Sequence, residues 1–316
     1  MALRIKAVLM SEDIPTFVRK FVKARMKSNV VNISRVSSGK RADTYFVDSK
    51  NKRYVLQFYG QNLRYQPSKR RYIYEKVRNN TKVLVPEVIS IGKFRNLSYL
   101  IMEGIDGKTF ADEENELKRK EKEYILETLG KYIAEFQNKI HIGKRFGWIE
   151  DTRIISQGNS NIGYLKSEVT RIVGWLNKTK NERQANLIRD YFSEKLGYLK
   201  KDCNPVLTWS EINKTNMLLQ RGSSDDIKLF LLDPGSAKSA PKEIDLLAAE
   251  SEFAPKDYAY IMKGYKSKNG KLDKKNLEIY RDYIMADTYS YKTMLKETED
   301  KDYKLVKDYL VEKGML

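Results

Sequence analysis

Short hydrophobic runs, each bounded by turn residues, mark residues 30–102 and are typical of β-strands. Val, Ile, Tyr and Phe are frequent in them, and Gly39, Asp48 and Asn51 lie between them. The runs predict five strands, at Val30–Val36, Thr44–Val47, Tyr54–Tyr59, Val88–Ile91 and Leu97–Met102. One helix, over roughly Lys69–Arg78, interrupts the set, although its apolar residues are sparse.

From about Asp112 onwards the hydrophobic spacing becomes helical. Apolar residues recur every three or four positions through Glu123–Ile140, which gives a helix with one apolar stripe. Similar patterns predict helices at Leu165–Leu176, Glu182–Leu199, Lys242–Glu250 and Leu277–Met294. Two short strands, Asn216–Gln220 and Lys228–Leu232, interrupt this region as a hairpin. We therefore predict an α+β chain with a β-rich part (1–102), a connector (103–107), a helical part (108–316), and a cleft between the halves.

Length and composition limit the class of protein. The 316 residues are ample for a buried core, and 41% hydrophobic and 32% charged residues are typical of a soluble globular protein. No apolar run approaches the length of a membrane span, and the first residues do not form a signal peptide, so we expect a cytoplasmic protein without a membrane partner. One cysteine, Cys203, and one histidine, His141, exclude an internal disulfide and a Cys/His zinc site.

The net charge is +18, from 60 Lys and Arg against 42 Asp and Glu. Such a charge favours anionic partners such as nucleic acid or phosphate groups. The basic residues are scattered, however, and many are interleaved with acids, as in Glu114–Lys122. We favour a solvated lysine-rich surface over a nucleic-acid site, because helices of mixed charge are usually solvent-facing.

Three segments carry chemistry. The first, Ser37–Asp43, is a small-residue turn between two predicted strands, where backbone N–H groups can approach phosphate oxygens. In the second, Glu211 precedes Asn216 by five residues, and in the third an apolar strand ends at Asp233. Phosphoryl transfer needs an acid that orients the attacking hydroxyl, and an Asn and an Asp that hold magnesium. A hairpin joining Asn216 and Asp233 would place both at one end of the cleft.

These segments resemble the aminoglycoside phosphotransferase and choline kinase superfamily, which has a two-lobed protein-kinase-like fold with a small β-rich N-lobe and a larger helical C-lobe. The resemblance covers roughly Val31–Ala249. Its catalytic loop matches Trp209–Glu211 with Asn216, and its metal-binding Asp matches Asp233. Further similarity lies at Tyr54–Gly60, Val85–Val88, Tyr99–Glu103 with Gly107, Phe146–Ile149, Leu232–Gly235 and Asp245–Ala248.

Several positions depart from the family. Its catalytic Asp is Glu211 here, its catalytic-loop His is Trp209, and its phosphate-anchoring base is the neutral Gln57. A Glu keeps the carboxylate but moves it by one methylene, and small positioning errors are costly in catalysis. Arg53, on the same strand face as Gln57, is one substitute for the base, and the loop residues Lys40 and Arg41 are others. Glu75 is the candidate for the helix acid that pairs with that base.

The resemblance implies a phosphotransferase that moves the terminal phosphate of ATP or GTP to a hydroxyl of a small molecule. It implies Glu211 as the catalytic acid and Asn216 and Asp233 as Mg²⁺ ligands. The residues expected at the nucleotide are Ser38, Gly39, Lys40, Arg41, Arg53, Gln57, Glu103 and Ile105. The departures favour an alternative, a kinase-fold pseudoenzyme that binds nucleotide or a partner without transfer. Charge alone supports a third hypothesis, nucleic-acid binding.

Overall fold

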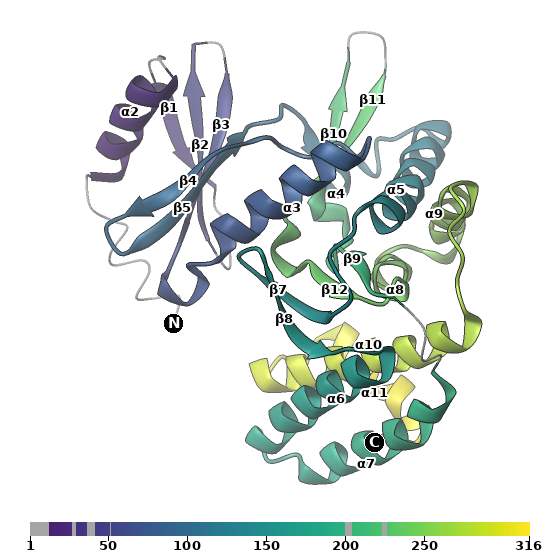
Figure 1. Cartoon of the computed structure of the whole chain (residues 1–316). Coiled ribbons are helices and arrows are strands. Elements are labelled where there is room, and N and C mark those ends of the chain that lie inside the picture. The colour runs from purple at the N-terminus through teal and green to yellow at the C-terminus, as the bar shows by residue number, and fades with distance from the viewer. Residues whose placement is uncertain (1–12, 27–29, 37–41, 51, 200–203, 223–225) are drawn as a thin grey trace. The chain divides into compact units, whose positions relative to one another are not determined.

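The computed structural model of the chain describes residues 13–26, 30–36, 42–50, 52–199, 204–222 and 226–316 (Figure 1). The loop Ser38–Arg41 and Cys203 therefore lie outside the described residues. The chain forms two compact units. The first comprises Met1–Ile125, Glu150–Arg153 and Lys214–Gly235, and the second comprises Leu126–Ile149, Ile154–Asn213 and Ser236–Leu316.

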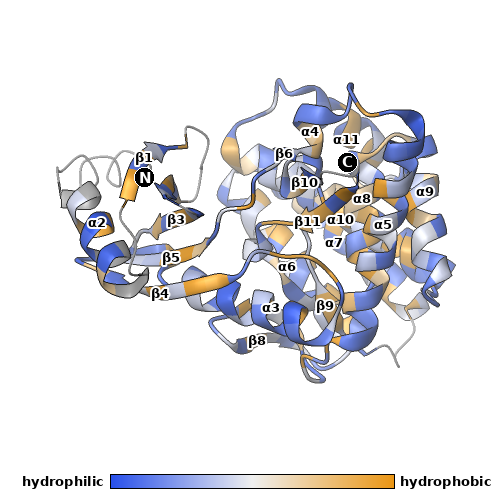
Figure 2. Ribbon diagram, turned by 90° about the horizontal axis from the view of Figure 1, so that it is seen from above, coloured by the Kyte–Doolittle hydropathy of each residue, from blue (hydrophilic) through white to orange (hydrophobic). Residues whose placement is uncertain are grey.

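An antiparallel five-stranded sheet, in the order β1-β2-β3-β5-β4, organises the first unit. Its strands are β1 (Val30–Arg35), β2 (Asp43–Ser49), β3 (Arg53–Tyr59), β4 (Val88–Phe94) and β5 (Leu97–Glu103). All five strands predicted from the sequence are confirmed, with ends that differ by a few residues. The hydrophobic end of β5 is orange in Figure 2.

The two faces of β3 differ because side chains alternate along a strand. Tyr54, Leu56 and Phe58 are buried in a core that also contains Val18, a residue of the N-terminal helix α2 (Asp13–Met26). Val55 and Gln57 therefore occupy the opposite face, and Gln57 is only partly buried there. Helix α2 was not expected from the sequence.

Helix α3 (Gln66–Asn80) follows the short 3-10 turn η1 (Gln61–Leu63) and is longer than the sequence predicted. Its buried face changes character along its length. Ile73 and Val77 supply ordinary hydrophobic packing near the end of the helix, but Gln66 and Arg70 are buried near its start. Buried polar groups require partners, so this end of α3 faces polar structure.

A second, three-stranded sheet in the first unit runs β11-β10-β6. Strands β10 (Met217–Arg221) and β11 (Ile227–Leu231) form the predicted hairpin, and β6 (Lys108–Thr109) pairs with β10. The short elements α4 (Phe110–Glu113) and η3 (Lys214–Asn216) adjoin it. Gly107 permits the approach of β6, because an added Cβ would lie 2.3 Å from the Leu219 carbonyl oxygen.

Helices dominate the second unit, together with a sheet in the order β8-β7-β12-β9. The strands are β7 (Phe146–Glu150), β8 (Arg153–Gly158), β9 (Val206–Thr208) and β12 (Lys238–Ala240). The helices are α5 (Arg119–Lys139), which begins in the first unit, α6 (Asn161–Lys178), α7 (Glu182–Lys195), α8 (Glu243–Glu252), α9 (Pro255–Ser267), α10 (Lys274–Leu295) and α11 (Lys301–Glu312). Two further 3-10 turns are η2 (Leu196–Tyr198), directly after α7, and η4 (Pro234–Ser236), which follows β11.

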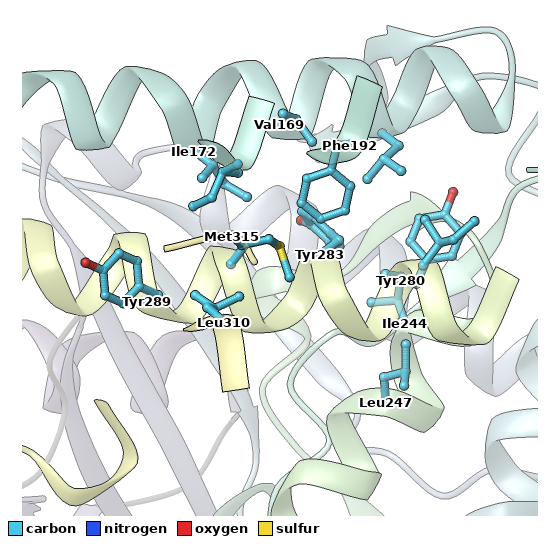
Figure 3. Close-up of a cluster of buried hydrophobic side chains, with 14 of the residues drawn as sticks. Val169, Ile172, Phe192, Ile244, Leu247, Tyr280, Tyr283, Tyr289, Leu310 and Met315 are labelled. Atoms are coloured by element: carbon cyan, nitrogen blue, oxygen red, sulfur yellow. The ribbon is translucent and has the colours of Figure 1, made fainter. Parts of the chain in front are cut away.

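The main core of the second unit lies between α6, α7, α10 and α11 (Figure 3). Ile172 and Phe192 contribute to it, and so do Tyr280, Tyr283 and Tyr289 from α10. These three tyrosines therefore serve as packing residues of α10. The α+β class predicted from the sequence is confirmed. None of the helices in the described ranges is long and apolar enough to cross a membrane.

Candidate active site

The turn that follows β11 is held by one face of α3. Gln66, Arg70 and Tyr74 are spaced four residues apart, so their side chains lie on one face of the helix. The Gln66 amide donates to the Gly235 carbonyl (3.3 Å), the Arg70 guanidinium bonds Asp233 Oδ1 (2.5 Å), and the Tyr74 hydroxyl accepts the Asp233 N–H (3.1 Å). The helix therefore fixes both the backbone and the carboxylate of Asp233.

Asp233 itself has a backbone conformation that favours such a turn. Its φ of +53° is left-handed, a conformation that Asp tolerates better than most residues. The Gly235 N–H donates to Asp233 Oδ1 at 3.0 Å. A Cβ at Gly235 would lie 2.7 Å from an Arg70 nitrogen, so the glycine makes room for the Arg70–Asp233 ion pair.

The hairpin brings Asn216 next to this turn, as the sequence predicted. Met217 pairs with Leu231 at the open end of β10 and β11, and the Leu232 N–H donates to the Asn216 carbonyl at 2.8 Å. Residues 216 and 233 thus flank the same end of the hairpin. The Asp233 side chain is 41% exposed, so it remains open to solvent although Arg70 is bound to it.

Gln57 is held by its neighbours on the sheet. The Tyr59 hydroxyl donates to Gln57 Oε1 at 2.7 Å, and Gln57 Nε2 lies 3.4 Å from the Thr44 hydroxyl of β2. Burial raises the pKa of Tyr59 to about 12, so its hydroxyl keeps its proton at neutral pH and acts as donor. Both ends of the Gln57 amide therefore have partners from β2 and β3.

A pocket of about 720 Å³ lies in the first unit beside the connector. Arg53, Glu103 and Ile105, three residues predicted to contact nucleotide, line it, and so do Gln220 and Phe230 of the hairpin. Its volume is within the range of about 300–1,000 Å³ that small-molecule sites usually have.

Backbone hydrogen bonds fix the connector along this pocket. The Glu103 N–H donates to the Glu87 carbonyl (2.8 Å), and the Gly104 N–H donates to the Arg53 carbonyl (2.9 Å). The Arg53 side chain bonds Asp48 at 2.7 Å and lies 3.7 Å from Asp106. Arg53 thus stands at the connector end of β3, four residues from Gln57.

Glu211 belongs to the second unit, in the loop that follows β9. The Ser236 hydroxyl donates to Glu211 Oε1 at 2.5 Å. Ser236 follows the Asp233–Gly235 turn in the sequence, although it belongs to the second unit. A hydroxyl donor at one carboxylate oxygen orients the group.

The backbone of the Glu211 loop is braced by Asp245 of α8. Asp245 is fully buried, and its carboxylate accepts from the Ser210 N–H (2.8 Å) and from the Gln137 amide (3.0 Å). Burial raises the pKa of Asp245 to about 7, although these hydrogen bonds and one from the Trp209 backbone favour the charged form. Asp245 therefore braces the backbone of this loop from α8.

Trp209 and Ser210 shape the loop that carries Glu211. The Trp209 side chain is fully buried, with its ring centroid 6.0 Å from that of Phe136 in α5. Ser210 has a left-handed φ of +66°, a conformation that glycine adopts more readily than serine. Trp209 therefore anchors the loop in the core, and Ser210 makes the sharp turn that leads to Glu211.

One sequence-based expectation was wrong, and one residue was missed. Glu75 was the candidate for the helix acid that pairs with the phosphate-anchoring base, but it forms a surface ion pair with Arg71 at 2.7 Å. Arg70 was not predicted as a site residue. The signal for it was the i, i+4, i+8 spacing of Gln66, Arg70 and Tyr74, three polar or amphipathic residues in a helix poor in apolar ones.

Asn216 and Asp233 offer one amide oxygen and one carboxylate. In the ranges that the structure describes, no cluster of three or more His, Cys, Asp or Glu side chains is suited to a metal ion. Magnesium is commonly bound by one or two protein oxygen ligands, with phosphate and water oxygens completing the shell. The pair therefore fits magnesium that arrives with a nucleotide, and does not fit an all-protein metal site.

Comparison with known proteins identifies the family of this chain. The family model of the phosphotransferase enzyme family matches residues 32–249, which is more than half of the chain. The chain belongs to the phosphotransferase enzyme family. None of the curated proteins matches it in sequence.

Solved structures of phosphotransferases share the fold. A thermostable mutant of aminoglycoside phosphotransferase APH(4)-Ia, in ternary complex with ADP and hygromycin B, superposes with a TM-score of 0.71 at 17% identity, covering 94% of this chain and 98% of that one. The GDP complex of an aminoglycoside 2′-phosphotransferase-IIIa mutant gives 0.67 at 12% identity, covering 94% and 96%. A fructosamine-3-kinase homologue from Haemophilus somnus 129PT gives 0.66 at 14%, covering 93% and 96%.

These likenesses confirm the kinase-like phosphotransferase fold that the sequence resemblance implied. At such low identities they concern the fold alone. The three proteins differ in the nucleotide or the substrate named for them, ADP with hygromycin B in one, GDP in another and fructosamine in the third. The substrate and nucleotide of this family member must therefore be argued from its own residues.

Proposed function

We propose that this phosphotransferase moves the terminal phosphoryl group of ATP or GTP to a hydroxyl of a small molecule. The observation that carries the proposal is the position of Asn216 and Asp233, which flank the same open end of the β10–β11 hairpin. An amide and a carboxylate at that place are what a magnesium-bound nucleotide requires. In this scheme Asn216 and Asp233 hold Mg²⁺, which neutralises phosphate charge when it is bound.

Glu211 supplies the base in this proposal. The substrate hydroxyl loses its proton to the Glu211 carboxylate, a bond forms between the hydroxyl oxygen and the γ-phosphorus, and the bond to the β–γ bridging oxygen breaks. The nucleoside diphosphate leaves with that electron pair. The hydrogen bond from Ser236 supports this role, because it fixes the longer glutamate arm at one oxygen. Positioning of the attacking hydroxyl is the main contribution of such an acid.

In this proposal, residues of the first unit bind the nucleotide. The base would lie in the pocket beside Glu103 and Ile105, with Arg53 at its rim, and the loop Ser38–Arg41 would cover the phosphates. In terms of the chain, residues 1–102 and the connector 103–107 would bind nucleotide, and residues 108–316 would supply the catalytic loop and the substrate site. The expected substrate is a small hydroxyl compound in the cytoplasm.

A pseudoenzyme is the second candidate, and Gln57 favours it. A neutral amide replaces the family's phosphate-anchoring base, and it is already bonded to Tyr59 and Thr44. A chain of this kind would bind Mg-nucleotide without transferring phosphate. Turnover therefore separates the two candidates, whereas nucleotide binding does not.

The test measures release of ADP or GDP from the purified protein with Mg²⁺ and a panel of aminoglycosides, fructosamines, choline and sugars. We expect turnover that Glu211→Gln lowers about 10²- to 10⁴-fold without weakening nucleotide binding. Asp233→Asn should weaken Mg-nucleotide binding itself. Glu194→Gln, at an exposed position of α7, is the matched control and should change neither quantity.

Two outcomes would contradict this proposal. If Glu211→Gln and Asp233→Asn both turn over like the wild type, neither residue has the proposed role. If the wild type binds Mg-nucleotide but is silent, and Glu211→Asp combined with Gln57→Lys turns over, the natural protein is the pseudoenzyme.

A further inference from the structure

The loss of the β3 base leaves a charge deficit in the first unit. A nucleoside triphosphate brings about four negative charges, and a family member normally meets part of that charge with a base at the position of Gln57. Arg53 is a poor replacement, because its guanidinium bonds Asp48 at 2.7 Å beside the connector. A cation that replaces the base has to lie close to Asp233, where the metal-bound phosphates would be.

Arg70 meets this requirement. It lies in the first two turns of α3, and its side chain is only 5% exposed although it is charged. Its guanidinium bonds Asp233 Oδ1 at 2.5 Å and lies 3.4 Å from the Gln66 amide oxygen. It also stands 5.5 Å from the centre of the Tyr59 ring, whose hydroxyl bonds Gln57. One chain of contacts thus runs from Gln57 through Tyr59 and Arg70 to Asp233.

We propose that Arg70 is the phosphate-anchoring cation of this protein, which has moved from strand β3 to helix α3. This inference rests on the proposed function, because it assigns the residue that binds the phosphates of the same nucleotide. The guanidinium has five N–H groups in a planar fork, so it can bond a carboxylate and a phosphate oxygen together. Arg70 would both position Asp233 and bind the nucleotide's phosphates.

The local structure agrees with an arginine whose place is specified. Gly235 leaves the space that the guanidinium fills, since a Cβ there would lie 2.7 Å from an Arg70 nitrogen. Tyr74, one helical turn further along, holds the Asp233 backbone, so the carboxylate that Arg70 contacts cannot turn away easily. The ion pair between the buried Arg70 and Asp233 is also compatible with a competing role, in which Arg70 blocks the carboxylate against metal.

The experiment compares binding of a nucleoside with binding of its triphosphate, by calorimetry with Mg²⁺, using whichever of ATP and GTP binds better. The phosphates account for the difference between the two affinities. We expect Arg70→Gln to weaken triphosphate binding roughly 10- to 100-fold and to leave nucleoside binding unchanged, because hydrogen bonds to charged groups have that strength. Arg71→Gln is the matched control, at the next position of α3 but in an exposed pair with Glu75, and should bind like the wild type.

A rescue variant tests relocation of the charge. Arg70→Gln combined with Gln57→Lys returns a cation to β3, and we expect it to recover most of the lost triphosphate affinity. If Arg70→Gln does not fold, as judged by circular dichroism and thermal melting, Arg70→Lys replaces it. Lysine keeps the charge but loses the fork, so triphosphate binding should fall several-fold while nucleoside binding stays the same.

The results that overturn the inference are distinct from failure of the proposed function. If the wild type binds no Mg-nucleotide, the proposed function fails for any choice of anchoring residue. If the wild type binds and Arg70→Gln, or Arg70→Lys in its place, binds triphosphate equally well, Arg70 is not the anchor. Tighter triphosphate binding by Arg70→Gln would show that Arg70 blocks Asp233.

Discussion

At the scale of single residues, the departures from the family are accommodated individually. Trp209 takes the place of a polar histidine and becomes a fully buried anchor against Phe136. Glu211 is one methylene longer than the family's Asp, and Ser236 bonds one of its oxygens. Ser210 lies between these two residues in the sequence, and its backbone N–H donates to the Asp245 carboxylate. Buried Asp245 thus links the stability of the Glu211 loop to pH.

We expect the melting temperature to fall as the pH rises from 5 to 8, and Asp245→Asn to flatten that dependence. The pKa of Asp245, ordinarily 3.8, is raised by burial to about 7 in the fold. A raised carboxyl pKa means that the folded protein binds the proton more tightly than the unfolded chain. The stability from this group is therefore full below pH 4 and lost as the pH rises through 7.

Thermal scans across this pH range measure the effect. Asp190→Asn, which removes an exposed carboxylate from α7, is the control and should keep the wild-type dependence. Parallel curves for wild type and Asp245→Asn would mean that Asp245 stays ionised throughout, held by its hydrogen bonds.

At the scale of elements, a buried charged cluster joins helices α6 and α10. Glu168 of α6 is completely buried and bonds Arg171 at 2.6 Å, and it also accepts from the Tyr283 hydroxyl of α10. Arg171 in turn bonds Asp287 of α10 at 2.9 Å. Burial alone would raise the pKa of Glu168, but Lys238 and Arg171 outweigh it and hold that pKa below its ordinary value.

We predict that Glu168→Gln lowers the free energy of unfolding by about 3–5 kcal/mol, because it leaves the largely buried Arg171 without its closest counter-charge. Urea unfolding followed by circular dichroism measures this loss. Glu194→Gln, at an exposed position of α7, should change the same quantity by about 0.5 kcal/mol or less. A loss of under 1 kcal/mol for Glu168→Gln would mean that Asp287 alone compensates Arg171.

At the scale of the whole molecule, the net charge of +18 is the most unusual property of the chain. Many of its cations are matched locally, as in the pairs of Arg221 with Glu121 (2.8 Å) and of Lys214 with Glu114 (2.6 Å). Ion pairs of this kind agree with the interpretation of the charge as a solvated surface, although an excess of cations remains.

If that interpretation is right, nucleic acid should bind weakly and without sequence preference. We expect dissociation constants of about 10⁻⁴–10⁻⁶ M near physiological salt, with a steep loss of affinity as salt rises, because counterion release supplies the free energy. Fluorescence anisotropy with unrelated duplexes and single strands at several salt concentrations measures this. Tight binding to one sequence at physiological salt would favour a nucleic-acid function over small-molecule phosphorylation.

The sequence by itself determined the family and much of the secondary structure, although it did not show helices α2, α9 and α11 or the sheet of the second unit. Strands of the first unit and the long helices were predictable, because a period of two or of 3.6 residues records which face of each element is buried. Asn216 and Asp233 were predictable as a pair, since the hairpin between them fixes their separation locally. The resemblance covering Val31–Ala249 identified the family, and Glu211 followed from its place in that resemblance.

Only the tertiary structure decided the partners of the site residues. Arg70 lies 163 positions before Asp233 in the sequence, so no local pattern showed that they meet. Glu75 was equally plausible until the rotation of α3 placed it on the surface with Arg71. Nor did any local pattern show that Ser236 bonds Glu211 or that Trp209 lies in the core. Hydrophobic periodicity fixes which face of an element is buried, whereas the polar contacts between elements depend on how those elements rotate and pack.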